Sequence, residues 1–144
     1  MKVLLLLVIT ALCWGDVFEV INIARSGMSV QQKKLEVIAE NVANLSTAKT
    51  SDGQIYKQKQ VIVKTNKENN TPYVSGVEER TDTVQKLYDP SNPESDDEGY
   101  VYVVDNSLST ELVNMALTRR LYEANAAVFN SAKQAAQTIM NLGK

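Results

Sequence analysis

The stretch of residues 108–142 constrains the fold more than any other part of the chain. It contains neither proline nor glycine, so it predicts one uninterrupted helix. Its apolar residues recur at steps of three and four and form a stripe on one face: Leu117, Leu121, Ala124, Val128, Ala132, Ala135, Ile139 and Leu142. A second set lies on a neighbouring face: Leu112, Met115, Tyr122, Ala126, Phe129, Ala136 and Met140. Such a helix is expected to pack on its own chain with one face and on another chain with the other.

A second long helix is predicted nearer the N-terminus, from Asp16 to about Leu45. Asp16 and Glu19 have the spacing of a capping box, which satisfies N–H groups of the first helical turn. Glycine is costly inside a helix, so Gly27 predicts a local break or the close approach of another helix. The apolar positions follow steps of three and four, interrupted only by Gln31: Ile21, Ala24, Met28, Leu35, Ile38, Val42 and Leu45.

Residues 1–15 form an apolar leader. One lysine is followed by an apolar run of about ten residues, and small residues stand near Gly15, as in a secretory signal peptide cleaved after Gly15. The run is short for a membrane-spanning helix, which needs about 20 apolar residues. Leu12 is bulky for the position before a lipid-modified cysteine, which disfavours an anchor at Cys13. The alternative is an uncleaved apolar extension that packs against a neighbouring protein.

Residues 47–106 read as a β-rich insert with loops. Strands are predicted over residues 55–64, 73–78, 83–88 and 100–104, where β-branched and aromatic residues gather. Pro90 and Pro93 predict a turn between the last two strands. The expected architecture is therefore mainly α with a small β insert. The terminal helices, over residues 16–46 and 107–144, are expected to pack as an antiparallel coiled-coil pair.

The composition provides few candidate residues for a catalytic or ligand-binding site. The chain has no histidine, a single cysteine and a net charge of −2, which removes the commonest general base and gives no nucleic-acid footprint. Asp96, Asp97 and Glu98 could hold calcium beside Asp89, but their spacing favours a solvated acidic turn. Arg120 and its neighbour Arg119 could bind an anion, although on a long helix they are more often surface charges. We therefore predict no catalytic, cofactor or metal site, and no enzyme.

Asparagine is unusually frequent in the two predicted helices. It is a poor residue for a helix interior because its amide competes for backbone hydrogen bonds. Repeated along two helices, it indicates either polar contacts that fix the register of packed helices or side chains that simply face water. The residues concerned are Asn41, Asn44, Asn114, Asn125 and Asn130.

Several motifs together resemble the flagellar basal-body rod family. The segment Ile38-Ala39-Glu40-Asn41-Val42-Ala43-Asn44 is similar to the N-terminal signature of flagellar axial proteins. The second half resembles the proximal-rod members of the family at Tyr88-Asp89-Pro90-Ser91-Asn92-Pro93, Glu98-Gly99-Tyr100-Val101, Asn114-Met115, Arg119 and Tyr122-Glu123-Ala124-Asn125. The resemblance extends over residues 18–144.

The resemblance implies a structural subunit in the periplasmic part of the rod, which assembles helically and transmits torque. The implied partners are other copies of the chain, other rod proteins, the adaptor between rod and inner-membrane ring, and the export machinery. It implies motif or subunit-interface roles for Asn41, Ala43, Asn44, Tyr88, Asp89, Pro90, Gly99, Tyr100, Asn114, Met115, Arg119, Tyr122 and Asn125. The apolar leader departs from the family, whose members usually begin with a short polar segment.

Two other functions fit parts of the sequence. A distal rod or hook-type subunit shares the first signature, but the short insert disfavours it. A secreted coiled-coil adaptor would form a small closed oligomer.

Within the rod hypothesis, Leu121→Asp is expected to break the chain's own helix pair, because it would bury a charge. Asn125→Ala is expected to leave folding intact and to weaken assembly.

Overall fold

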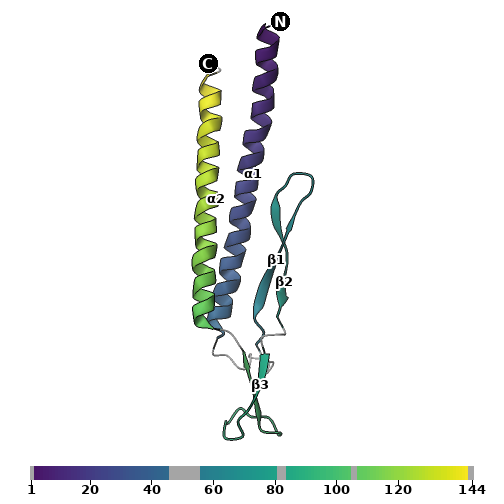
Figure 1. The fold of residues 1–144 in the computed structure, drawn as a ribbon, viewed down its shortest axis with the longest axis vertical. Coiled ribbons are helices and arrows are strands. Elements are labelled where there is room, and N and C mark those ends of the chain that lie inside the picture. The colour runs from purple at the N-terminus through teal and green to yellow at the C-terminus, as the bar shows by residue number, and fades with distance from the viewer. Residues whose placement is uncertain (1, 46–55, 81–83, 105–106, 143–144) are drawn as a thin grey trace. The chain divides into compact units, whose positions relative to one another are not determined.

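The computed structural model describes residues 2–45, 56–80, 84–104 and 107–142 (Figure 1). Two long helices, α1 and α2, lie at the ends of the chain and are packed against each other, with short strands between them in sequence. The predicted fold, mainly helical with a small β part, is confirmed. The elements are α1 Lys2–Ala43, β1 Lys59–Thr65, β2 Pro72–Glu79, β3 Val84–Tyr88, β4 Tyr100–Val104 and α2 Leu108–Leu142.

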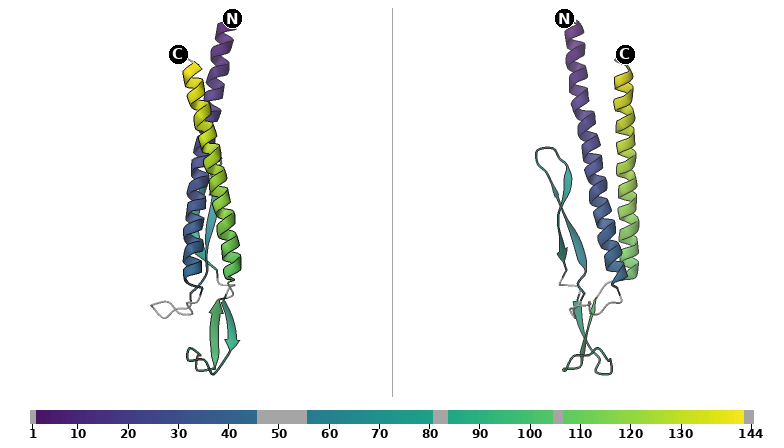
Figure 2. Two further views of the ribbon diagram at one scale, coloured as in Figure 1. Left: turned by 90° about the vertical axis from the view of Figure 1, so that its left-hand side faces the viewer. Right: turned by 180° about the vertical axis from the view of Figure 1, so that it is seen from behind.

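The chain divides into two compact units, and each contains part of both helices. One unit combines Met1–Gln32 and Val63–Val74 with Arg119–Lys144, and the other combines Lys33–Ile62 with Ser75–Thr118. In one unit the first part of α1 accompanies the last part of α2, and in the other unit the last part of α1 accompanies the first part of α2. The helices therefore run antiparallel, as predicted, and Figures 1 and 2 show them side by side in opposite directions.

The structure shows which face of α2 meets the rest of the chain. Thr118 and Ala132 are buried on it, and Phe129 is partly buried. Most of the first predicted stripe faces solvent, since Leu117 is 55% exposed and Leu121 is 52% exposed, although its member Ala132 is buried. The expectation that Leu121→Asp would break the intramolecular helix pair is therefore wrong, because an aspartate at this position would face water.

The first helix begins earlier than predicted, at Lys2 instead of after Asp16. Asp16 consequently lies inside α1 and cannot cap its start. Over residues 17–43 of α1, the part whose side chains the structure describes, the buried positions are Ala24, Gly27, Val30, Val37 and Asn41, while most of the predicted apolar stripe is half-buried beside them. Among the described residues, no helix carries an apolar stretch long enough to cross a membrane.

Gly27 marks a close approach of the two helices. A Cβ atom built on Gly27 would lie 2.9 Å from Nδ2 of Asn125 and 3.1 Å from its Cγ. Of the two predicted possibilities at Gly27, close approach is therefore the observed one, because α1 continues through it as an α-helix. Gln31, which interrupts the apolar stripe, has a buried Oε1 atom without a hydrogen-bond partner among the described residues.

The strands pair in sequence order as two hairpins. β1 pairs with β2, and their turn is closed by a hydrogen bond of 2.9 Å from Asn66 N–H to the Thr71 carbonyl. β3 pairs antiparallel with β4, and Tyr88 lies opposite Tyr100 at the end of the register. The strand positions agree with the prediction except that β1 begins at Lys59, four positions after the expected start at residue 55, which lies outside the described residues.

Candidate functional site

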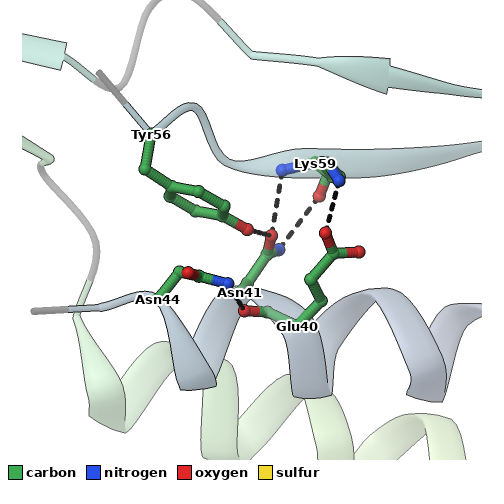
Figure 3. A network of polar contacts seen from close by, with 5 residues as sticks. All are labelled: Glu40, Asn41, Asn44, Tyr56 and Lys59. Atoms are coloured by element: carbon green, nitrogen blue, oxygen red, sulfur yellow. Dashed lines mark hydrogen bonds and ion pairs between the residues drawn. The ribbon is translucent and has the colours of Figure 1, made fainter. Parts of the chain in front are cut away.

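The side chain of Asn41 joins the end of α1 to the beginning of β1 (Figure 3). Its Nδ2 donates to the Lys59 carbonyl oxygen at 3.0 Å, and its Oδ1 accepts from the Lys59 N–H at 2.9 Å. The same Oδ1 accepts from the Tyr56 hydroxyl at 2.9 Å. The amide thus pairs with Lys59 as a neighbouring strand would, and the strand is fixed to the helix at a defined residue.

The side chains at the centre of this network are buried, so its hydrogen bonds contribute more to the stability of the fold than bonds exposed to water would. Asn41 is only 2% exposed and Tyr56 only 5% exposed. A buried polar group is costly unless it is paired, and here all three partners of the amide are matched in geometry. At the rim, Glu40 forms an ion pair with the Lys59 ammonium, but both side chains are partly exposed, so the pair contributes little.

Asn44 serves the end of α1 itself. Its Nδ2 donates to the Glu40 carbonyl oxygen at 2.8 Å, and its backbone N–H donates to the same oxygen at 3.1 Å. The last carbonyl groups of a helix have no partner within it, so these bonds satisfy one of them. Asn41 therefore has a tertiary role, whereas Asn44 mainly closes its own helix and also forms a side-chain contact with Tyr56 that acts to lower the pKa of that hydroxyl.

The hydroxyl of Tyr56 is expected to make the stability of the fold depend on pH in the alkaline range. Burial, together with the negative charges of Glu40 and Glu111, raises the pKa of Tyr56 from its ordinary value of 10.0 to about 12. Because this folded-state pKa is raised, the hydroxyl contributes stability that is fully present below about pH 10 and is lost as pH rises towards 12. We expect Tyr56→Phe to flatten the alkaline part of the stability curve. Urea unfolding at several pH values checks this, and an unchanged curve would contradict it.

Glu111, in the first turn of α2, is a second buried polar residue, which the sequence did not single out. It is 1% exposed and accepts a hydrogen bond from Gln58 Nε2. This bond links the first turn of α2 to the residue before β1. Neither Tyr56 nor Gln58 was predicted, because nothing in the local sequence signals partners that are so far away along the chain.

The second motif region forms the tip of the β3–β4 hairpin. The rings of Tyr88 and Tyr100 meet edge to face with centroids 5.1 Å apart, and the Asp89 N–H donates to the Gly99 carbonyl at 3.0 Å. Gly99 has a φ of +81°, which favours glycine, and a Cβ there would lie 3.2 Å from the Cβ of Pro90. The structure thus brings together Tyr88, Asp89, Pro90, Gly99 and Tyr100.

The acidic part of this tip is bonded to its own backbone. Asp96 Oδ1 accepts from the Tyr100 N–H at 2.8 Å and from the Glu98 N–H at 3.1 Å. The bond from the Tyr100 N–H is the main reason that the pKa of Asp96 is lowered. Within the described residues, no group of three or more cysteine or acidic side chains is placed to hold a metal ion.

The remaining motif residues lie apart from one another along the two helices. Ala43, Asn114 and Arg119 are exposed, and Arg119 forms an exposed ion pair with Glu123 at 3.1 Å. Met115 and Asn125 are half-buried on the inward side of α2, and Tyr122 is 37% exposed. For the asparagines, both interpretations hold in part: Asn125 packs at Gly27, whereas Asn114 and Asn130 are exposed.

Comparisons with known proteins point to one family. A family model described as flagella basal body rod protein matches residues 21–48, which include Asn41 and Asn44. The flagellar basal-body rod protein FlgC of Borreliella burgdorferi is 32% identical over 139 residues, which cover 81% of this chain and 90% of the relative. FlgC of Buchnera aphidicola subsp. Schizaphis graminum is 33% identical, covering 90% and 99%. FlgC of Salmonella typhimurium is 32% identical, covering 87% and 96%.

Proposed function

The chain belongs to the family of the flagellar basal-body rod protein FlgC, and from this premise we propose that it is a structural subunit of the proximal rod. The similarity to a FlgC relative over 90% of this chain carries the proposal, because it includes both helices and the insert between them. A match confined to the first helix would not separate FlgC from other rod subunits.

The distribution of apolar side chains supports assembly. Leu117, Leu121 and Val128 leave about half of their surface to solvent on one side of α2. Exposed apolar patches of this kind commonly mark contacts with other proteins. A contact between two different surfaces of identical copies generates a ring when its rotation closes and an open helical assembly when it does not, and the second is what a rod requires.

The proposed partners are other copies of this chain, other rod proteins, the adaptor between rod and inner-membrane ring, and the export machinery. The proposed location is the periplasmic part of the rod, where the subunit would transmit torque without catalysing a reaction. The names of the relatives support a structural role. Residues 16–46 and 107–144 would form the coiled-coil core, and residues 47–106 the insert.

The motif residues divide into two groups in this proposal. Asn41, Asn44 and the tip around Gly99 maintain the subunit's own structure through the bonds described above. Exposed residues such as Tyr88, Asn114 and Arg119 would contact neighbouring subunits. Residues 1–15 would act as a secretory leader that is removed after Gly15.

The test is the intact mass of the protein in purified basal bodies, with a strain lacking its gene as the control. We expect the protein to be present with a mass that corresponds to a start at Asp16. A full-length mass would overturn the proposed cleavage and would leave the rod function in place. Absence from basal bodies would overturn the rod function and would favour the secreted adaptor.

A further inference from the structure

A groove of about 870 Å³ separates part of α1 from the tip of the β1–β2 hairpin. Its two sides, within residues 18–30 and 68–74, belong to the same compact unit. Phe18 lines it from α1 and is 52% exposed, and Tyr73 lines it from the hairpin and is 47% exposed. Both sides therefore carry aromatic surface whose burial would be favourable.

The two sides of the groove also carry opposite charges. Arg25 of α1 and Glu68 of the hairpin tip both line it and are both exposed. No ion pair joins these two side chains in the part of the chain that the structure describes. Glu19 is the remaining charged residue of the lining and repels Glu68, so the electrostatic attraction draws the tip towards Arg25.

The tip of the hairpin is bonded to itself. The Asn66 N–H donates to the Thr71 carbonyl at 2.9 Å, and the Asn66 Oδ1 accepts from the Glu68 N–H at 2.9 Å. The Asn69 Oδ1 accepts from the Thr71 hydroxyl at 2.6 Å and from its N–H at 3.2 Å. These bonds lie within the turn, so the tip can change its distance from α1 as one body without losing them.

The base of the same hairpin is held by bonds to other elements. Lys59 is paired with Asn41, and the Arg80 N–H donates to the Gln58 carbonyl at 2.7 Å. Gly76 lies in β2 on the way to the tip, and a Cβ built on it would have no atom within 4 Å. Glycine weakens the interior of a strand, and nothing packs against this one to resist bending.

We infer that the β1–β2 hairpin is a strap that is fixed at its base and closes with its tip onto α1. On closure Glu68 reaches Arg25, and Tyr73 and Phe18 are buried together over Val30, which is already only 3% exposed. The open strap leaves this face of α1 accessible to other proteins, and the closed strap covers it. The device belongs to a single copy, so it goes beyond the proposed rod function and does not depend on it.

The experiment traps the closed strap with a disulfide in the purified full chain. Ser29→Cys and Thr71→Cys place one thiol on each side of the groove, in a chain whose single native cysteine is removed by Cys13→Ser. Thiols replace hydroxyl groups at both positions, so the change in volume is small. A disulfide requires Cα atoms within about 7 Å of each other, so its rate of formation under a mild oxidant measures closure.

Charge reversals then test what drives the closure. Arg25→Glu and Glu68→Arg each reverse one charge across the groove, and the variant with both changes restores opposite charges with their positions exchanged. The matched control is Arg120→Glu, which makes the same change at an exposed residue of α2 that does not line the groove. Circular dichroism verifies that each variant keeps its helices.

We expect each single reversal to slow formation of the disulfide about fivefold, because the attraction of an exposed pair becomes repulsion. The double reversal and Arg120→Glu are expected to stay within about twofold of the parent rate. No disulfide in any variant, a disulfide between two copies, equal rates in all variants or a double reversal as slow as the single ones would overturn the inference. None of these results affects the rod function, which the mass in basal bodies tests separately.

Discussion

Replacing Asn41 by leucine is expected to lower the free energy of unfolding by about 3 kcal/mol, since a buried polar group left without a partner costs roughly 1–3 kcal/mol. Leucine has a similar size, so the loss of stability comes from the missing hydrogen bonds and not from a change in side-chain volume. The Tyr56 hydroxyl and both backbone groups of Lys59 would lose their bonds to the amide. Urea unfolding of the full chain, followed by circular dichroism, measures the effect.

Two control variants separate this tertiary role from a local one. Asn44→Ala removes one hydrogen bond at an accessible helix end and is expected to cost about 0.5–1.5 kcal/mol. Asn41→Asp keeps the acceptor for the Tyr56 hydroxyl and the Lys59 N–H, but it buries a carboxylate that faces the Lys59 carbonyl oxygen, so it should cost at least as much as Asn41→Leu. Equal losses for Asn41→Leu and Asn44→Ala would contradict the role assigned to Asn41.

The periodicity of the sequence predicted both helices and their antiparallel pairing, but it did not predict which face of α2 turns inward. Both of its apolar sets have helical spacing, so local pattern alone cannot choose between them. The choice depends on α1, where Gly27 admits the side chain of Asn125. This close approach turns the face of α2 that bears Asn125 and Phe129 towards α1, and it leaves Leu121 exposed.

The network at Asn41 was predictable only in part. The family signature singled out Asn41 and Asn44, since a motif can be read from adjacent residues. Their partners are not adjacent: Lys59 lies 18 residues after Asn41, and Glu111 lies 53 residues after Gln58. Such pairings are determined by the tertiary fold, and glutamate in a first helical turn ordinarily faces solvent, so its sequence position gives no sign of burial.

Replacing Gly27 by leucine is expected to lower the free energy of unfolding by about 3 kcal/mol, at the upper end of the cost of overpacking a well-packed site. Even the first carbon of the new side chain would lie 2.9 Å from Asn125 Nδ2, and the remaining atoms would require α1 and α2 to separate. The matched control is Gly76→Ala, because a Cβ at Gly76 has no atom within 4 Å. Thermal unfolding of both variants measures the difference.

A compensating substitution identifies the cause of that loss. Gly27→Ala alone combines a gain in helix propensity of about 1 kcal/mol with a clash against Asn125, so it should be neutral or destabilising. Adding Asn125→Ala removes the atoms that clash, and the double variant is expected to be more stable than Gly27→Ala alone by about 1 kcal/mol or more. If Asn125→Ala has the same effect with glycine or alanine at position 27, the two residues are independent and the helices do not meet at this point.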